Sequence, residues 1–391
     1  MILDVLFTST SRGWAALRKT ASAITLMLLC VCSSRIQAGI LGGLLGSGPD
    51  SGKLAKLQYE LHDDMPVTSI VWSPDGNFIA ASSAEGNKIH IWDLALRQRI
   101  HELERSSGGE FNELSWSPDG RYLSVCDGFR SRLRIYDSRI WTQVHLIVSD
   151  HDTNCKTSTF SSDGSELAVL GNSLSVYATD DWRLLKFVDL QKSWALGMQF
   201  RAIAFVPTSR TILIGGDGRG GRDRHIDHLG QVLILDSEDS IPSRMLPAYL
   251  EDPPAAIGGV ICFAISPDGQ SVATGTQTGA GNPPIELVRA SVHVLKIADG
   301  SLQGAPLDGQ PFGEEIGVEY TPDGRYLIVA HGGTYTAHAI HLIDAKTLQV
   351  LDVVHAGNSV YGLAVQPQSK QFAIAAGDRI VVWSLPVAPQ R

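Results

Sequence analysis

Ser73-Pro74-Asp75-Gly76 is the first of a series of four-residue stretches that recur along this 391-residue chain. Its clear copies are Ser117-Pro118-Asp119-Gly120, Ser161-Ser162-Asp163-Gly164, Ser266-Pro267-Asp268-Gly269 and Thr321-Pro322-Asp323-Gly324; its degenerate copies are Val206-Pro207-Thr208-Ser209 and Gln366-Pro367-Gln368-Ser369. Serine or threonine accepts backbone hydrogen bonds, proline presets φ, aspartate suits the third position, and glycine lets the chain leave without strain. The sequence therefore predicts seven tight turns, each joining two antiparallel strands.

Apolar residues alternate on both sides of every turn, which is the pattern of β-strands. The column two residues before the proline position holds Trp72, Trp116, Phe160, Phe205, Ile265, Tyr320 and Val365. We expect this column to lie in the core. A third strand follows in every copy, with the apolar pairs Ile89/Ile91, Leu133/Ile135, Leu174/Val176, Val232/Ile234, Val292/Val294, Ile340/Leu342 and Ile380/Val382. The chain is therefore predicted to be all-β, with seven repeats.

The third strand ends in Trp92-Asp93 in the first repeat and in Tyr136-Asp137 in the second. This ending, the strand pattern and the repeat spacing resemble the WD-repeat β-propeller family, whose repeats of about 40–45 residues form four-stranded blades. The resemblance covers residues 54–385 and is to a secreted, bacterial-type member with degenerate repeats. It implies a seven-bladed β-propeller of four-stranded antiparallel blades. The family's upstream histidine is matched at His62 and His355.

The seventh repeat ends without a fourth strand, whereas a spare alternating segment at 54–61 precedes the first repeat. A propeller closes when its first strand completes the last blade, which leaves no open edge between blades. We therefore expect closure by the N-terminal strand, with residues 54–61 beside residues 379–385.

Residues 1–38 have the pattern of a signal peptide: the basic residues Arg12, Arg18 and Lys19, an apolar run over 21–32, and Ala38 at the cleavage position. The run is shorter than the roughly 20 residues that span a bilayer. We expect export to the periplasm or medium, with no membrane span after cleavage; an uncleaved anchor is the alternative. Gly/Ser-rich residues 39–52 are predicted to be a flexible linker and residues 53–391 the propeller.

Removing the four basic residues and one acidic residue of 1–38 changes the formal net charge from −9 to −12. An acidic chain without a basic run argues against nucleic acid and anionic membranes as partners. Three cysteines remain, Cys126, Cys155 and Cys262. Cys126 and Cys155 fall in consecutive repeats, so whether they pair stays open, but three buried thiols are the favoured interpretation.

The rim opposite the predicted turns carries the variable loops, with insertions near 217–230, 277–290 and 331–338. Long loops on a rigid scaffold commonly bind partners. We therefore expect a monomeric, non-enzymatic scaffold without a cofactor that binds a protein, peptide or glycan on this rim. The candidate contacts are Arg219, Arg222 and Arg224 for carboxylates, and Trp194, Phe312 and Tyr335 as aromatic anchors. Simple solvation of these loop residues is the alternative.

Two further functions compete with the scaffold. A metal site could use loop histidines, for which the weak candidates are His225, His228, His331 and His338. A lactonase-like or a cofactor-dependent, dehydrogenase-like enzyme is suggested by family analogy alone. The sequence contains neither a Gly-x-Ser-x-Gly nucleophile elbow nor a Cys-x-x-Cys-His haem motif. His90, His293 and His341 are interpreted as strand residues and not as site residues.

Overall fold

The structure is a computed structural model that describes residues 48–83, 88–104, 114–127, 132–148, 155–190, 198–218, 231–236, 239, 244–247, 260–277, 290–310, 315–332, 338–368 and 371–386. The chain divides into two units, Met1–Ser47 and Gly48–Arg391, and the description that follows concerns the second. Within the described part of the chain, no helix is both long enough and apolar enough to cross a membrane.

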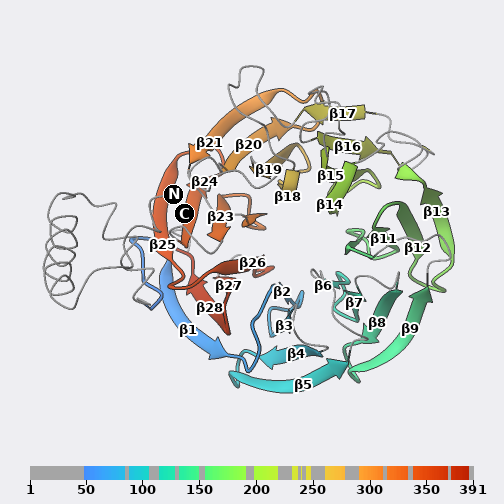
Figure 1. Ribbon diagram of the computed structural model, residues 1–391, viewed down its shortest axis with the longest axis horizontal. Helices are drawn as coiled ribbons and strands as arrows, with labels where there is room; N and C mark the ends of the chain where they lie inside the picture. The colour runs from blue at the N-terminus through green and yellow to red at the C-terminus, as the bar shows by residue number, and fades with distance from the viewer. Residues whose placement is uncertain are drawn as a thin grey trace, which may run out of the picture. The chain divides into compact units, whose positions relative to one another are not determined.

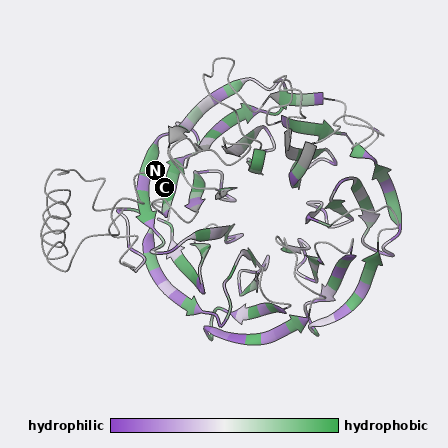
Figure 2. Cartoon of the chain, viewed as in Figure 1, coloured by the Kyte–Doolittle hydropathy of each residue, from purple (hydrophilic) through white to green (hydrophobic). Residues whose placement is uncertain are grey.

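Seven four-stranded antiparallel sheets form the blades of a β-propeller (Figure 1). In each of the first six blades, four consecutive strands follow one another from the innermost to the outermost position. This is the predicted fold class. The alternation of apolar and polar residues that predicted the strands is visible along the ribbon in Figure 2.

The strands of the first three blades are as follows. Blade one contains β2 (Ser69–Trp72), β3 (Phe78–Ser82), β4 (Lys88–Asp93) and β5 (Gln98–Glu104). Blade two contains β6 (Leu114–Trp116), β7 (Tyr122–Cys126), β8 (Arg132–Asp137) and β9 (Thr142–Val148). Blade three contains β10 (Thr157–Phe160), β11 (Glu166–Leu170), β12 (Leu174–Ala178) and β13 (Leu184–Val188).

The remaining blades use longer strands in several places. Blade four contains β14 (Met198–Phe205), β15 (Ile212–Gly218), β16 (Gln231–Leu235) and β17 (Arg244–Pro247). Blade five contains β18 (Val260–Ile265), β19 (Ser271–Gln277), β20 (Ala290–Lys296) and β21 (Leu302–Gln310). Blade six contains β22 (Glu315–Tyr320), β23 (Tyr326–Gly332), β24 (Ala339–Asp344) and β25 (Val350–His355). Blade seven contains β26 (Val360–Val365), β27 (Gln371–Ala376), β28 (Arg379–Ser384) and β1 (Lys56–His62).

The recurring turns form because their side chains complete the hydrogen bonding of the backbone. In the first turn the Ser73 hydroxyl donates to Asp75 Oδ1 (2.5 Å) and accepts from the Phe78 N–H (2.9 Å). The Gly76 N–H donates to the Ser73 carbonyl (2.8 Å). Gly76 has φ = +73°, and the glycines of the other four clear copies have φ between +68° and +73°. The fourth turn position is therefore in the left-handed region that favours glycine.

Each turn also packs against the turn of the preceding blade. A Cβ atom added to Gly120 would lie 3.7 Å from Pro74 Cδ, and one added to Gly164 would lie 3.6 Å from Pro118 Cδ. Gly324 has the same relation to Pro267, at 3.9 Å. The proline of one turn thus contacts the glycine of the next, so this rim is held together from blade to blade.

The core lies between neighbouring blades. Trp72, Trp116 and Phe160, which the apolar column placed in the core, are 3%, 8% and 7% exposed. Trp72 packs with residues of blade seven, and Trp116 packs with residues of blade one. These side chains therefore join blades, and the prediction that they are buried is confirmed.

The N-terminal strand β1 pairs antiparallel with β28 and forms the outermost strand of blade seven. The register places Tyr59 opposite Val382 and Leu61 opposite Ile380. This is the pairing that the missing fourth strand of the seventh repeat predicted. The first and last parts of the sequence therefore share one sheet.

Residues just before β1 form hydrogen bonds with β25, the outermost strand of blade six; we call these contacts the clasp. The Asp352 carboxylate in β25 accepts the backbone N–H groups of Lys53 (3.0 Å), Leu54 (2.7 Å) and Ala55 (2.9 Å). Asp50 accepts the His355 N–H (2.7 Å), and the Asp50 carbonyl accepts Trp383 Nε1–H (2.8 Å). Asp50, which lies within the segment predicted to be a linker, thus contacts the propeller.

Replacing Asp352 by alanine should lower the free energy of unfolding by about 2–3 kcal/mol at pH 7, because three backbone N–H groups lose a charged acceptor. Burial raises the pKa of the Asp352 carboxyl, but the N–H donors of residues 53–55 outweigh burial and hold that pKa below its usual value. The contribution of Asp352 is then complete above its unfolded-state pKa of about 3.9 and is lost as the pH falls through the lower folded-state pKa.

Urea unfolding at pH 7 and at pH 3 measures this dependence. The stability difference between the parent and the Asp352→Ala variant should shrink at pH 3. Asp299, an exposed residue that accepts the Ser301 N–H within one turn, provides the control, and Asp299→Ala should change stability by less than about 0.5 kcal/mol. An equal loss at both pH values for Asp352→Ala would contradict the assigned role.

Cys126 and Cys155 form a disulfide, with their Cα atoms 5.3 Å apart. The favoured interpretation of three buried thiols is therefore wrong. Cys126 ends β7 in blade two, and Cys155 lies just before β10 in the adjacent blade, so the packing of these two blades brings together residues that are 29 positions apart. Cys262, in β18, is outside this disulfide.

Candidate functional site

In every blade, a residue at the same position of the outermost strand contacts the next blade. The residue is the register partner of the second apolar residue of the third strand. Written with the third-strand residue first, the pairs are Ile91/His101, Ile135/His145, Val176/Lys186, Ile234/Arg244, Val294/Gly304, Leu342/Asp352 and Val382/Tyr59. The His101 ring lies 5.3 Å from the Trp141 ring of blade two, measured between centroids. Lys186 Nζ donates to the Asp239 carbonyl of blade four at 2.8 Å. The position therefore reaches the connection between the third and fourth strands of the next blade.

In the connection between the third and fourth strands, one residue with a positive φ lies next to the preceding blade. It is four positions after the end of the third strand. The residues at this position are Arg97, Trp141, Trp182, Gly300 and Leu348, with φ of 54°, 52°, 59°, 74° and 57°. Trp182 stacks on His145 of blade two, with 5.7 Å between ring centroids and 16° between ring planes. Leu348 approaches Gly304 of blade five so closely that an added Cβ would lie 2.6 Å from Leu348 Cδ1. We call these residues the plug residues, because Trp141, Trp182 and Leu348 pack into the cores between blades.

Several of the seven grooves lack this apolar arrangement: Lys186 contacts Asp239 between blades three and four, and the two grooves beside blade seven differ in other ways. Blade seven has no connection between β28 and β1, since these strands come from opposite ends of the chain. The segment around residues 52–55 lies there instead, against Asp352. In the groove between blades seven and one, the plug residue is Arg97, whose guanidinium lies 4.4 Å from the centre of the Tyr59 ring.

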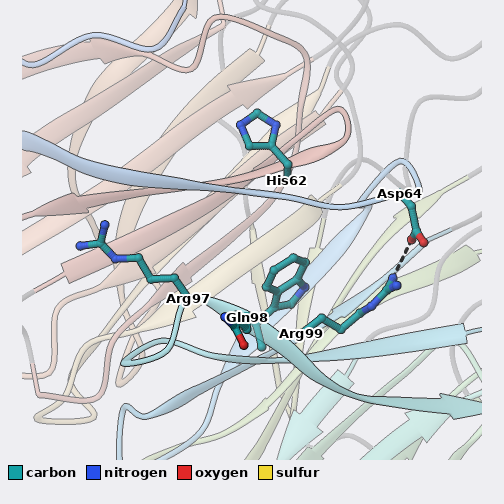
Figure 3. Close-up of a pocket in the computed structure, with 6 residues that line it drawn as sticks. His62, Asp64, Arg97, Gln98 and Arg99 are labelled. Atoms are coloured by element: carbon teal, nitrogen blue, oxygen red, sulfur yellow. Dashed lines mark hydrogen bonds and ion pairs between the residues drawn. The ribbon is translucent and has the colours of Figure 1, made fainter.

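A shallow cavity of about 470 Å³, largely open to solvent, lies beside Arg97 (Figure 3). Its lining residues are His62, Asp64, Trp92, Arg97, Gln98 and Arg99. Figure 3 shows the guanidiniums of Arg97 and Arg99 extending in opposite directions. Arg99 Nη1 donates to Asp64 Oδ1 at 2.7 Å, and this hydrogen bond lowers the pKa of Asp64 to about 2. Among the residues that the structure describes, Arg97 forms no hydrogen bond or ion pair.

A buried polar network lies next to this cavity. His90, which is 1% exposed, places Nδ1 2.8 Å from Asp63 Oδ1. Trp92 Nε1 donates to Asp63 Oδ2 at 3.2 Å. Because Asp63 also donates its backbone N–H to the Asp378 carbonyl (2.8 Å), this one residue ties blade one to blade seven. The network therefore holds the adjacent residue Asp64 at the cavity.

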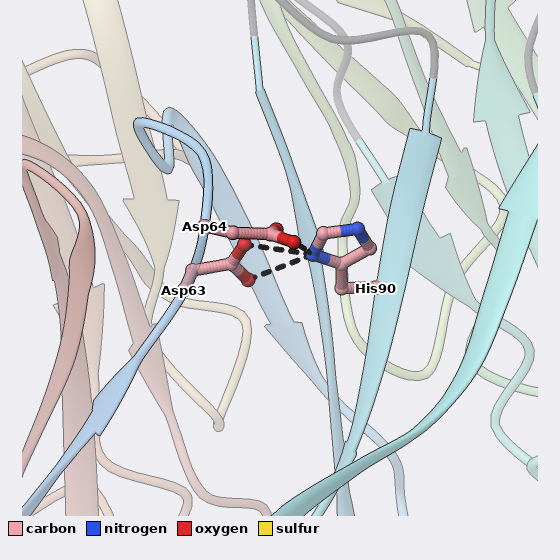
Figure 4. A group of neighbouring side chains, drawn as sticks. All are labelled: Asp63, Asp64 and His90. Atoms are coloured by element: carbon pink, nitrogen blue, oxygen red, sulfur yellow. Dashed lines mark hydrogen bonds and ion pairs between the residues drawn. The ribbon is translucent and has the colours of Figure 1, made fainter.

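Asp63, Asp64 and His90 bring possible metal ligands within 4.8 Å of one another (Figure 4). However, Arg99 Nη1 lies 2.7 Å from the Asp64 carboxylate and 3.2 Å from both ring nitrogens of His90. A guanidinium thus supplies the positive charge that these groups would otherwise attract. The arrangement fits an ion-pair network and does not fit a metal ion.

The binding residues that the sequence singled out lie outside the described residues. They are Trp194, Arg219, Arg222, Arg224, Phe312 and Tyr335, together with the histidines His225 and His228. The placement of these eight side chains therefore stays a prediction.

His331, predicted to be a loop residue, is instead a fully buried residue of β23, because that strand continues to Gly332. Its ring lies 4.9 Å from that of His341, at 83°. Burial lowers the pKa of His331 well below its ordinary value and the pKa of His341 to about 4. Burial also lowers the pKa of the half-buried His338. Within the described residues, neither His331 nor His338 belongs to a group of three possible metal ligands.

His90, His293 and His341 lie in β4, β20 and β24, which confirms that they are strand residues. The sequence did not predict the partners of the side chains at this position of the third strand. His90 contacts Asp63, and Arg134, which has the equivalent position in blade two, contacts Asp127. Arg134 Nε donates to the buried Asp127 carboxylate at 2.8 Å. A polar residue between two apolar residues of the third strand, as in Ile89-His90-Ile91, could have indicated a buried polar contact. His62, matched to the family histidine, is exposed, and it is the next residue, Asp63, that contacts the third strand.

Comparisons with known proteins support the class that the fold defines, a seven-bladed β-propeller. The family model "WD domain, G-beta repeat" matches residues 55–93, which cover β1 to β4. No curated protein matches the chain. A solved chain of Kuenenia stuttgartiensis hydrazine synthase is similar in fold, with a TM-score of 0.66 and 17% sequence identity over 84% of this chain and 98% of that one. The family model thus matches one repeat of the chain, and the seven four-stranded blades make the fold a seven-bladed β-propeller.

Proposed function

We propose that this protein is an exported, non-enzymatic scaffold that binds a protein, peptide or glycan partner on the rim opposite the recurring turns, over blades four to six. WD-repeat propellers commonly mediate protein interactions. The Cys126–Cys155 disulfide supports export, because disulfides persist in oxidising compartments such as the periplasm.

The lengths of the second strands carry this proposal. β3, β7 and β11 each have five residues, whereas β15, β19 and β23 each have seven. All six strands begin at equivalent turns, so the additional residues lengthen blades four to six at the opposite rim. The sequence inserts residues 219–230, 278–289 and 333–337 directly after these longer strands. Three consecutive blades therefore support the loops that carry Arg219, Arg222, Arg224 and Tyr335.

The rim with the recurring turns is less suited to a partner. Its serine, threonine and aspartate side chains are engaged in hydrogen bonds within each turn, as for Ser117 with Asp119 and Ser266 with Asp268. Its prolines and glycines pack between blades. Both features stabilise the scaffold and leave the other rim for binding.

The Arg222→Ala/Arg224→Ala double variant tests the proposal. The mature protein serves as bait for crosslinking in a periplasmic extract, and captured partners are quantified by mass spectrometry. We expect the double variant to reduce capture of the specific partner at least tenfold, because guanidiniums make paired contacts with carboxylates. Its free energy of unfolding should stay within about 0.5 kcal/mol of the parent, as is usual for loop substitutions.

The matched control is Arg121→Ala/Arg325→Ala, which removes two guanidiniums from the turn rim. The Arg121 guanidinium lies 4.7 Å from the centre of the Tyr122 ring, and the Arg325 guanidinium lies 5.1 Å from the centre of the Tyr326 ring. The control should capture the partner as the parent does. Equal capture by the Arg222/Arg224 variant would contradict the proposed contacts, and stoichiometric haem, quinone or metal in the purified protein would contradict the non-enzymatic scaffold.

A further inference from the structure

We propose that the groove between blades seven and one is a second binding site, in which Arg97 binds a carboxylate group. This site is separate from the rim over blades four to six. Three observations support it: a difference from the two grooves that follow it, the state of the Arg97 guanidinium, and the charge of the cavity lining.

The difference is visible when equivalent grooves are compared. Between blades one and two, Trp141 packs edge-on against Phe78, with 5.8 Å between ring centroids. Between blades two and three, Trp182 packs edge-on against Tyr122 at 5.3 Å. In blade seven the residue equivalent to Phe78 and Tyr122, at the start of the second strand, is Gln371. In this groove both positions of the aromatic pair hold polar residues, and the cavity lies here. Polar residues also lie between blades three and four, where Glu166 begins the second strand and Asp239 lies in the connection after β16.

Arg97 is exposed, and no carboxylate among the described residues pairs with its guanidinium. Its Cζ atom lies 4.4 Å from the centre of the Tyr59 ring, a contact that uses none of its N–H donors for a hydrogen bond. Its backbone φ of 54° is close to those of Trp141 and Trp182 at the equivalent positions, and its contact with Tyr59 places it against blade seven. Since an oriented side chain loses little freedom on binding, the N–H edge of this guanidinium is suited to a bidentate contact with a carboxylate.

The charges of the lining select an anion. Arg99 is paired with Asp64 at 2.7 Å, so among the described lining residues Arg97 supplies the unpaired positive charge. The formal net charge of the chain, −9, repels acidic groups at long range, so the attraction of a carboxylate to Arg97 is a short-range one. His62 and Gln98, which also line the cavity, add hydrogen-bonding groups beside the carboxylate.

A carboxylate could come from an acidic peptide segment or from a small organic acid. β1 is the outermost strand of blade seven, so one of its edges is open to an extended peptide. An acidic peptide can combine backbone contacts along β1 with a carboxylate at Arg97, and it should therefore bind more tightly than the small acid.

Isothermal titration of the mature protein tests this with three probes: a capped Gly-Glu-Glu-Gly peptide, the matching Gly-Gln-Gln-Gly peptide, and glutarate. We expect the glutamate peptide to bind and the glutamine peptide to bind at least tenfold more weakly. Binding of the glutamate peptide alone would assign a peptide source, and equal binding of glutarate would assign a small acid. The absence of binding by both acids, or equal binding by the glutamine peptide, would overturn the proposal.

Three variants localise the binding. Arg97→Gln removes the charge and should weaken the glutamate peptide at least tenfold. Arg97→Trp installs the plug residue of blades two and three and should abolish binding. Arg121→Gln removes a guanidinium that also lies over a tyrosine, Tyr122, but does not line the cavity, so it should leave affinity unchanged. Circular dichroism melting shows whether each variant is folded; a folded Arg97→Gln variant that binds as the parent does would overturn the proposal.

Discussion

Removal of residues 1–61 is expected to leave the protein without a soluble monomeric form. The deletion removes β1, so β28 becomes an open edge with unpaired backbone groups along Arg379–Ser384. It also removes the residues that bond to Asp352 and Trp383. Ile380 and Val382 lose their cover from the N-terminal strand, and an exposed apolar edge strand promotes association between chains. Size-exclusion chromatography with light scattering should therefore show aggregates.

A chain that begins at Gly48 is the matched control and should remain monomeric, because it retains the clasp at Asp50 and the whole of β1. A synthetic peptide of residues 48–62, present during refolding of the truncated chain, should restore a soluble species by supplying the strand in trans. A truncated chain that is monomeric and melts at the temperature of the control would show that β1 does not hold the ring closed.

The parts of the fold that depend on local chemistry were predictable from the sequence. Each turn forms within a few residues, as the hydrogen bonds of Ser73 with Asp75 and Phe78 show. Its residue types therefore appear directly in the sequence. The pairing of β1 with β28 spans the whole chain, but counting strands in the seventh repeat was enough to predict it.

The parts that depend on contacts between blades were not predictable in the same way. Arg97 and Trp141 occupy equivalent positions, and their role is set by what the preceding blade presents, Tyr59 in one case and His101 in the other. The link from Asp63 to His90 is similar, because a connecting loop supplies one partner and a strand the other. Residue type alone did not distinguish His331, which is buried in β23, from a loop histidine.

Replacing Trp383 by alanine is expected to lower the free energy of unfolding by about 3–5 kcal/mol, the range for large-to-small substitutions in a core. Trp383 is fully buried and stacks on Phe372, with 5.3 Å between ring centroids and 8° between ring planes. It belongs to the core cluster that joins blades six and seven with Ala55 of the N-terminal segment. The substitution therefore weakens the last blade at the point where the two ends of the chain meet. Urea unfolding followed by circular dichroism measures the loss.

Trp383→Phe separates packing from hydrogen bonding. It retains an aromatic ring against Phe372 but removes the Nε1–H group that donates to the Asp50 carbonyl at 2.8 Å. A single neutral hydrogen bond contributes about 1 kcal/mol, so this variant should lose much less stability than the alanine variant. Hydrogen exchange should increase in both variants over residues 50–62, because both release Asp50. A loss below about 1 kcal/mol for Trp383→Ala would mean that the ring is not part of a packed core, and protected exchange over 50–62 would mean that the clasp does not depend on Trp383.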